Sequence, residues 1–410
     1  MWVKADHVTW VHSPSSTEHS ANKVKNPTAF KLWEYLGSEY IFLKGILFAR
    51  NDLTPYERKG ITRQQIQSTD TYNALDVFIE TAYLRCSQPQ DRVYGLLGIL
   101  ADIDVGECVV DYQLSLTQVY AQFINMFMKK YQSLLFICYF PRRQTSSSIP
   151  SWIPAPEREP DFPYRDIEVS RASGKIAASN ARISQDGLAI TVRGLLLDRV
   201  TEINPGGTLH STPISAWTSA LEYFCRQIQT SEENPPWLDS QVLDLIFPPW
   251  GDKFYQAHAG RTQPYGIEEK RSILNDLVQM NNTRDCSSLS LEDIFYGNGT
   301  ISKTMSQSRK SSFWLVRLAI LRRILFATES KRVGLAVGLE LQPKDEIWVL
   351  FGCPLPLVLR PRPDKGGGYM YVASARATGL MDGKVCEKIL GTGKTEADYK
   401  GPPVCTLTIW

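Results

Sequence analysis

The chain has few of the residues from which enzymes usually build metal or acid–base sites. Only 5 of its 410 residues are histidine, and no two of them stand four positions apart with a carboxylate between them, as a zincin motif requires. Three of the five lie in the polar N-terminal stretch, where surface positions are expected. They are His7, His12, His19, His210 and His258. We therefore predict surface histidines and no metal site.

Cysteine adds little to this inventory. The 8 cysteines are spread along the chain, and no two form a Cys-x-x-Cys pair. A disulfide framework and a structural zinc site are therefore poorly supported. Cys86 follows Arg85 in a polar neighbourhood, but a nucleophilic cysteine also needs a histidine that only the fold can place. The sequence favours a buried or inert thiol there.

Charge and hydropathy exclude two further classes of protein. Lysine and arginine number 45 against 43 acidic residues, a net charge of +2, which excludes a strongly basic nucleic-acid binder and an acidic tail. No apolar run reaches the roughly 18 residues of a membrane-spanning helix. The stretch from Met1 to Ser20 also lacks the apolar core of a signal peptide. We predict a soluble, cytoplasmic, globular protein of about two or three domains.

Known catalytic motifs are absent or incomplete. Residues 391–395 read GTGKT, but a phosphate-binding loop needs glycine where Lys388 stands. No serine lies in a Gly-x-Ser-x-Gly elbow. Asp102 and Asp104 lack the later ligands of a calcium loop. We assign no catalytic, cofactor-binding or metal-binding residue and expect no cofactor.

Paired and clustered charges have simpler structural explanations. Asp91-Arg92 and Asp198-Arg199 are adjacent opposite charges, which favour structural roles, and Arg142-Arg143 is a small basic cluster. Residues 309–323 mix basic and apolar side chains and end in Arg322-Arg323. A basic amphipathic helix can bind membranes or acidic partners. In a large globular chain, a buried helix with its charges at the rim is the favoured interpretation.

Hydrophobic periodicity indicates helices in the first part of the chain. Apolar residues recur at helical spacing over 71–86, and a shorter helical run follows at 91–100. The clearest helix is 115–131, where Ser115 and Gln118 form the pattern of a capping box. The apolar segment 134–140 is either a buried strand or the end of a helix. Clustered prolines then mark a boundary near residues 141–175.

The later part of the chain alternates between strands and helices. Residues 176–203 predict antiparallel strands with a turn at 184–187, and 213–325 read as mainly helical. Strand signals return at 333–337, 346–351, 357–359 and 369–373. We predict an α+β fold, with a helical region at 1–165 and an α+β region at 166–410. In the latter, strands at 176–203 and 324–390 form a small antiparallel sheet or barrel, and 213–323 form a largely helical insertion.

Three segments resemble blocks of the fungal heterokaryon-incompatibility (HET) domain family. They read QPQDRVYGLLG at 88–98, VDYQLSLTQVY at 110–120 and IPSWIP at 149–154, in the family's order and spacing. Four later stretches are similar to the family's C-terminal region: 194–203, 326–328, 357–360 and 379–383. The resemblance covers roughly residues 70–390. No single block is specific, but their order is.

The resembling residues have structural explanations. Asp91 suits the N-terminus of a short helix, and the tyrosine and leucines that follow it are expected to pack inward. Prolines on both sides of Trp152 favour an extended segment that lays the indole on the core. Gly194 and Gly383 suit tight backbone positions. We predict that these residues are scaffold rather than catalysts.

The chain also departs from the family pattern. Family members carry an earlier half, likened to TIR domains, with blocks of the type ALSYvWG and iDalCInQ, and neither occurs here. Ala155-Pro156-Glu157 stands where the family's LPSWvPdW block ends in tryptophan. The resemblance therefore implies an N-terminally shortened member. Any nucleotide-cleaving or self-assembling activity of the family is expected in the half that is missing.

Two functions from different classes follow. The resemblance implies an intracellular role in fungal non-self recognition, that is, heterokaryon incompatibility or its regulation. The protein would act by contact with other proteins, such as HET-family or NLR-like partners. The alternative is a cofactor-independent cyclase, isomerase or ligand-binding protein of fungal secondary metabolism, built on the same scaffold around a small molecule. A gene product without a selected function is a third possibility.

Overall fold

The chain divides into two compact units, Met1–Val105 and Gly106–Trp410. The computed structural model describes residues 86, 88–97, 108–139, 149–153, 170–205, 213–226, 240–247, 266–281, 316, 320, 323–337, 340–391 and 404–410. In the first unit, the described helix is α4 (Asp91–Leu97), which buries Val93, Tyr94 and Leu96. Tyr94 and Leu96 pack inward as expected of this block, whereas Leu97 is half-buried. All other described elements belong to the second unit. The division of the chain at residue 165 stays a prediction.

The second unit opens with two helices, α5 (Leu116–Tyr131) and α6 (Leu135–Tyr139). The predicted capping box is present: the Gln118 backbone N–H donates to Ser115 Oγ at 3.3 Å, and the Ser115 N–H donates to Gln118 Oε1 at 2.9 Å. These two bonds satisfy donors that a helix start leaves open. Gln132 ends α5 in the left-handed conformation, with φ 48°. Helix α6 lies within the segment 134–140, so the described part of this segment is helical and not a strand.

Eight strands form the sheet of the second unit. They are β1 (Arg182–Ile183), β2 (Ile190–Ile203), β3 (Arg323–Thr328), β4 (Val333–Val337), β5 (Glu346–Leu350), β6 (Leu357–Arg362), β7 (Gly368–Ala377) and β8 (Val404–Ile409). All neighbours pair antiparallel except β7 and β8, which meet in parallel at Tyr369 and Ile409. A short 3₁₀ helix, η6 (Pro363–Lys365), joins β6 to β7. The described residues thus combine helices with an antiparallel sheet, in agreement with the predicted α+β class.

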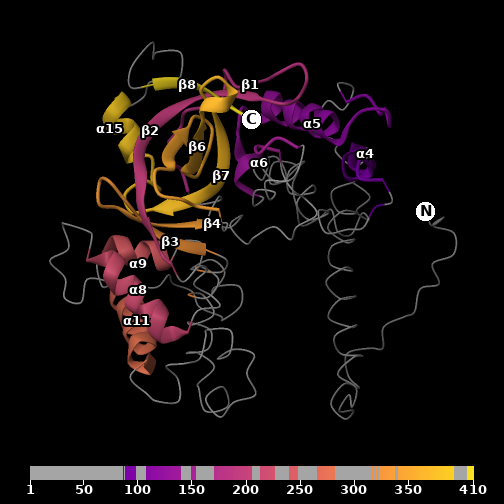
Figure 1. The fold of residues 1–410 in the computed structure, drawn as a ribbon. Helices are drawn as coiled ribbons and strands as arrows, with labels where there is room; N and C mark the ends of the chain where they lie inside the picture. Colours follow the sequence, from indigo (N-terminus) through magenta and orange to yellow (C-terminus); the bar gives the residue numbers. More distant parts are fainter. Residues whose placement is uncertain are drawn as a thin grey trace, which may run out of the picture. The chain divides into compact units, whose positions relative to one another are not determined.

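The long strand β2 organises the sheet (Figure 1). Its first part pairs with β1 and β8, its middle with β5, and its last residues with β3. Its register shifts between Leu196 and Asp198 and again between Val200 and Glu202. Such bulges bend a strand and increase its twist, so one strand can change partners along its length. The pairings run from β2 through β3, β4, β7, β6 and β5 back to β2, which makes a closed circuit.

Strands β3 and β4 are buried on both faces. Alternate residues point to opposite sides of a strand. Ile324 and Phe326 therefore join one core, together with residues of β5, β6 and β7, whereas Leu325 and Ala327 join a second core beneath the helices. This double burial explains why these segments read as continuous apolar runs rather than as an alternation of apolar and polar residues.

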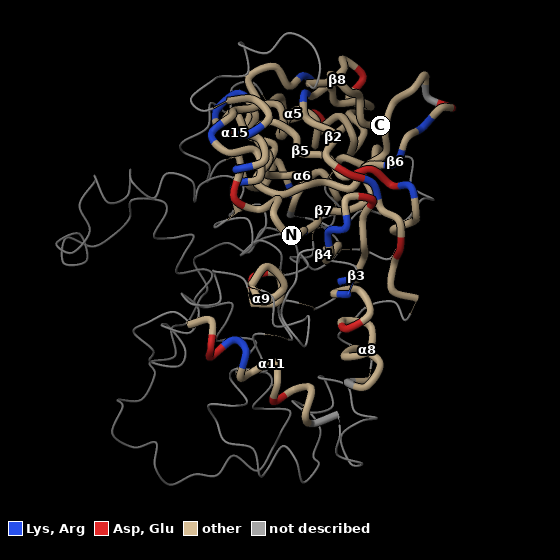
Figure 2. Tube along the Cα trace, turned by 90° about the vertical axis from the view of Figure 1, so that its left-hand side faces the viewer, with Lys and Arg blue, Asp and Glu red and all other residues tan. Residues whose placement is uncertain are grey.

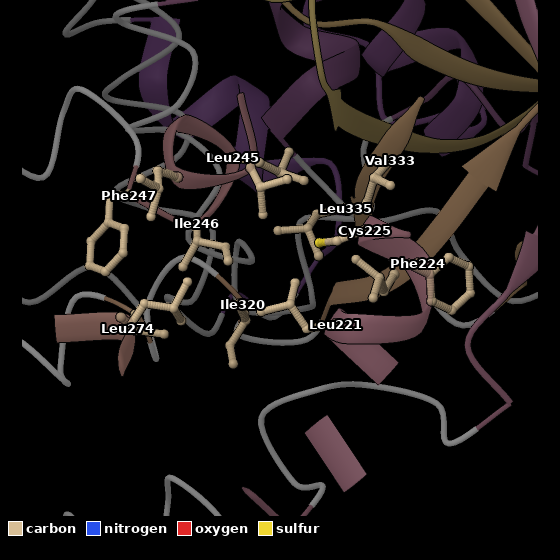
Figure 3. Packing of buried hydrophobic residues seen from close by; sticks show 14 of the residues in the cluster. Leu221, Phe224, Cys225, Leu245, Ile246, Phe247, Leu274, Ile320, Val333 and Leu335 are labelled. Atoms are coloured by element: carbon tan, nitrogen blue, oxygen red, sulfur yellow. The ribbon is translucent and has the colours of Figure 1, made fainter. Parts of the chain in front are cut away.

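The second core is formed with the helices of the insertion, α8 (Ile214–Cys225), α9 (Ser240–Ile246) and α11 (Ile267–Asn281). Figure 3 shows side chains from α8, α9 and α11 in one cluster with Val333 and Leu335 of β4. Val316 and Ile320, from the segment expected to form a basic amphipathic helix, are buried in the same cluster. Charges of both signs lie on α11 (Figure 2), where Arg271 Nη1 donates to Glu268 Oε1 at 2.9 Å. The helical character predicted for this region is confirmed where the structure describes it.

Three elements differ from the prediction. Strand β3 begins at Arg323, so the last residues of the stretch expected to be helical belong to the sheet. Helix α15 (Lys384–Leu390) lies within the range predicted as strands. Strand β8 was not predicted at all. In the part of the chain that the structure describes, no helix combines the length and the apolar character that crossing a bilayer requires.

Candidate binding groove

A groove of about 290 Å³ lies between α5 and the turn that joins β1 to β2. Its walls are uncharged and combine polar with apolar surface in about equal parts. The lining residues are Leu114, Gln118, Ala121, Gln122, Asn125, Ile183, Ser184, Gln185 and Gly187. The site therefore combines one face of a helix with the edge of a short strand, two parts of the chain that lie some sixty residues apart.

Helix α5 presents a row of carboxamides to the groove. Gln118, Gln122 and Asn125 follow one another at intervals of four and three residues, so they share one face of the helix. The adjoining face of α5 is apolar and includes Val119 and Phe123, which are buried. Burial of that apolar face fixes the rotation of the helix and so turns the carboxamides toward the groove.

The opposite wall is a compact turn. The Gly187 N–H donates to Ser184 O at 2.9 Å, and the Ser184 N–H donates to Ala189 O at 2.9 Å. Asp186 Oδ1 accepts from Ser184 Oγ at 2.5 Å and from the Leu188 N–H at 3.0 Å. These hydrogen bonds, that of Ser184 first, lower the pKa of the Asp186 carboxyl from its ordinary value of 3.8. The turn is therefore held by its own side chains rather than by a ligand.

Ile183 of β1 directs its backbone N–H and C=O away from β2. In the β1–β2 pair, Ser184 hydrogen-bonds with Ala189, and the same register places Arg182 opposite Thr191 and Ile183 opposite Ile190. Hydrogen-bonded and non-bonded positions alternate in an antiparallel ladder. The N–H and C=O of Ile183 consequently have no partner on β2, and Ile183 is also one of the residues that line the groove.

Some of the carboxamides already have partners and others do not. Gln118 serves in the capping box, and Gln122 Oε1 accepts from Cys108 Sγ at 3.7 Å. The side-chain amides of Asn125 and Gln185 have no partner among the described residues. Each amide offers two donors and an acceptor. The groove therefore contains amide groups that are able to bind a partner. Its described lining carries no carboxylate, imidazole, thiol or amine for proton transfer.

Exposed apolar residues stand close in the sequence to the lining residues of both walls. Val109, Val110 and Tyr112, which precede the lining residue Leu114, are 62%, 56% and 52% exposed. Leu188, which follows the lining residue Gly187, is 41% exposed. Exposed large apolar groups that gather near a groove are typical of surfaces that bind a partner. We call these four residues the apolar rim.

The block around Trp152 supports this region. The indole is 1% exposed, packs edge-on against Phe136 of α6 and donates from Nε1 to Leu188 O at 3.3 Å. The predicted packing of this tryptophan on the core is confirmed. The predicted tight positions are confirmed as well. A Cβ on Gly194 would lie 2.6 Å from Val349 O, and a Cβ on Gly383, which has φ +79°, would lie 2.7 Å from Arg171 O.

The charged pair at 198–199 is structural, as expected. Asp198 is buried and accepts from Thr328 Oγ1 at 2.7 Å, from the Ser330 N–H at 3.1 Å and from Arg332 Nη1 at 2.6 Å. Its neighbour Arg199 donates to Glu346 Oε1 at 3.2 Å. A buried carboxylate with this many donors holds the end of β3 against β2 and has little capacity left for a ligand.

A second buried carboxylate was not singled out from the sequence. Asp345, directly before β5, accepts from Arg360 Nε at 2.7 Å and Nη2 at 2.9 Å, and from the Gln342 N–H at 2.8 Å. This two-pronged ion pair joins the start of β5 to the second half of the antiparallel strand β6. The only hint in the sequence was the position of Arg360 inside a family-like block, since the pairing depends on the sheet.

A comparison with curated proteins finds one fungal relative at a distance. The chain is similar to "Heterokaryon incompatibility protein 6, OR allele" of Neurospora crassa, with 22% identity over 350 residues. The match covers 76% of this chain and 51% of that protein, so the chain spans about half the length of the curated relative. No family model matches the chain. No solved structure matches it either.

The similarity supports, at a distance, the HET relationship that the sequence blocks suggested. Helix α5, which forms one wall of the groove, begins in the second of those blocks and continues beyond its end at residue 120. Cys86 is described and exposed. Several residues considered from the sequence lie outside the described residues: the five histidines, Asp102, Asp104, Arg142, Arg143, Arg322 and 392–395.

Proposed function

We propose that this protein acts in fungal heterokaryon incompatibility or its regulation, as a HET-family protein that works by contact with another protein. The observation that carries the proposal is the groove beside α5, with carboxamides in reserve and an apolar rim. The similarity to a heterokaryon incompatibility protein over 76% of the chain supports the biological setting. The cytoplasm is the proposed location.

The groove is suited to an extended polypeptide segment. A carboxamide has a donor and an acceptor side by side, as a peptide group does, so Asn125 and Gln185 can pair with the backbone of a partner. The outward N–H and C=O of Ile183 offer the partner one further strand-like contact. Covering a half-exposed residue of the apolar rim, such as Tyr112, would contribute about 1 kcal/mol. The neutral walls favour a partner segment without charge.

The sheet supplies a rigid base for this contact. We propose that the closed circuit of strands from β2 to β7 is the small barrel predicted from the sequence. Strand β2 is part of this circuit and also pairs with β1, so it connects the β1–β2 turn to the circuit. Interaction sites mounted on regular elements keep their geometry better than sites on loops.

A small-molecule enzyme finds less support in the groove. An isomerase or cyclase needs a group that moves a proton or an apolar chamber that shapes its substrate. The described lining has no titratable side chain, and its volume of about 290 Å³ is at the small end of ligand pockets, which range from about 300 to 1,000 Å³. We keep this alternative as one outcome of the test.

The test is capture of partners in a fungal host. The chain would be expressed by induction, cross-linked in the cells and purified, with growth followed in parallel. We expect HET-family or NLR-like proteins among the cross-linked partners. Replacing both carboxamides, Asn125→Ala with Gln185→Ala, should lower the capture about thirtyfold, since each lost hydrogen bond is worth about 1 kcal/mol.

Matched controls make the result specific. Asn275→Ala removes an exposed carboxamide from α11, away from the groove, and should leave capture unchanged. Circular dichroism and a thermal unfolding curve would verify that each variant is folded. Equal capture by the groove variant and the unmodified chain would contradict the proposal. A folded chain that binds no HET-family protein but alters a small molecule in the cell extract would establish the alternative.

A further inference from the structure

Two cysteines far apart in the sequence meet in the interior of the second unit. Cys138 belongs to α6 and Cys353 to the turn after β5, and their sulfur atoms are 3.1 Å apart. Their side chains are 1% and 0% exposed. Since 215 residues separate the two positions, no spacing pattern in the sequence indicates the pair.

The backbone holds the two thiols in place. Next to Cys353, Gly352 O accepts from the Leu134 N–H at 2.9 Å and from Ser133 Oγ at 3.2 Å, which ties the start of α6 to the turn. The Cys353 N–H donates to Leu350 O at 3.0 Å. A disulfide bond is about 2.05 Å long, so the sulfur atoms need to approach by only about 1 Å.

We propose that Cys138 and Cys353 form a reversible disulfide when the protein meets a hydroperoxide, and that this bond locks α6 onto the sheet. This inference rests on the cysteine pair and is independent of the proposed function. Helix α6 directly follows α5, which forms one wall of the groove. Cys353 follows β5, which pairs with β2, and β2 carries the turn that forms the other wall. The oxidised form would therefore hold the two walls at a fixed separation.

The reaction needs no group beyond the two thiols and the peroxide. One thiolate attacks a peroxide oxygen, the O–O bond breaks, and a sulfenic acid and hydroxide form. The second thiol then attacks the sulfenic sulfur, the S–O bond breaks, and water leaves as the S–S bond forms. With hydrogen peroxide, two thiols and one peroxide yield one disulfide and two waters. The two sulfur atoms lose the two electrons that the peroxide gains.

The surroundings make this a slow response. Burial, and then the neighbouring Cys353, raise the pKa of the Cys138 thiol well above its ordinary value of 9.0. Tyr371 of β7 is also buried beside the pair, and burial raises its pKa as well, so it provides no charge to stabilise a thiolate. Because the thiolate is the reactive form, the folded protein should respond to sustained rather than brief exposure to peroxide.

The experiment uses the full chain with Cys86→Ser and Cys405→Ser, which removes the two exposed thiols among the described cysteines. Protein would be incubated with hydrogen peroxide, denatured in an alkylating reagent and digested without reduction. We expect a peptide pair linked through Cys138 and Cys353, an intact mass lower by about 2 Da, and reversal by dithiothreitol. The unfolding midpoint should rise, because the bond closes a long loop.

Two further variants identify the pair. Cys353→Ser should abolish the linked peptide. Cys386→Ser should not, because this buried thiol donates to Ala172 O at 3.1 Å and has no thiol partner among the described residues. Recovery of both Cys138 and Cys353 in alkylated form after peroxide treatment would overturn the proposal. Linkage of either one to a different cysteine, or oxidation to a sulfinic acid without linkage, would overturn it as well.

Discussion

Gly187 of the β1–β2 turn lies directly against Ala121 of α5. A Cβ on Gly187 would be 3.0 Å from Ala121 Cβ, and the backbone of Gly187 has φ +73°. Both residues line the groove, so their contact joins its two walls. A Cβ at this position would crowd Ala121, and the left-handed backbone also favours glycine there.

The first prediction concerns this contact. Gly187→Ala should lower the free energy of unfolding by about 2–3 kcal/mol, the sum of backbone strain at positive φ and crowding against α5. Gly366→Ala is the matched control, because Gly366 has φ +68° but open space where a Cβ would lie. It should show only the strain, about 1–2 kcal/mol. Urea unfolding measures both, and equal losses would show that the contact with Ala121 is unimportant.

The second prediction concerns the pair of Asp345 and Arg360. Asp345→Asn should lower the free energy of unfolding by about 3 kcal/mol, because it leaves the Arg360 guanidinium largely buried without its counter-charge. Arg362 and Asp364 make a similar pair on the surface, with side chains 33% and 57% exposed. Asp364→Asn should therefore cost less than about 1 kcal/mol. Chemical denaturation measures the free energy of unfolding of both variants. Similar losses in the two variants would contradict the claim that burial makes the pair of Asp345 and Arg360 more important.

The third prediction concerns the ionisation of Tyr369. Burial, and then the nearby Glu346 carboxylate, raise the pKa of this phenol to about 12 from 10.0. The folded state therefore keeps a proton that the unfolded chain loses between pH 10 and 12. Stability is expected to fall with rising pH across this window. Unfolding curves at several pH values should show that the free energy of unfolding falls less with rising pH in Tyr369→Phe than in the unmodified protein.

A second variant separates the two causes of this shift. Glu346→Gln removes the charge but leaves the burial, so the pKa of Tyr369 should fall only part of the way back, as ultraviolet difference titration against Tyr369→Phe would measure. A pKa of Tyr369 near 10 in the unmodified protein would refute the burial of the phenol.

Local patterns were sufficient for part of this fold. The capping residues Ser115 and Gln118 and the periodic apolar face predicted α5, because helix starts and amphipathic faces depend on residues within a few positions. Strand β4 was predicted at 333–337, where it lies. The turn at 184–187 was recognised from its polar residues and Gly187.

Other elements depended on distant partners. Strand β8 pairs with Ile190–Leu195 of β2, more than two hundred residues earlier, and its own alternation is too short to identify it. Helix α15 follows Gly383, which has a positive φ and packs closely against Arg171 and Gly174. Local sequence patterns do not reveal this contact. The sequence could show the carboxamide row on α5, but not the turn that faces it.

The sequence by itself determined the α+β class, the main helix with its cap, and a scaffold role for Trp152, Gly194 and Gly383. These features follow from periodicity, steric freedom and side-chain size, which act locally. Only the tertiary structure decided that α5 and the β1–β2 turn enclose a groove and that Cys138 meets Cys353. Such juxtapositions arise when the sheet closes through β2 and brings together residues that are remote along the chain.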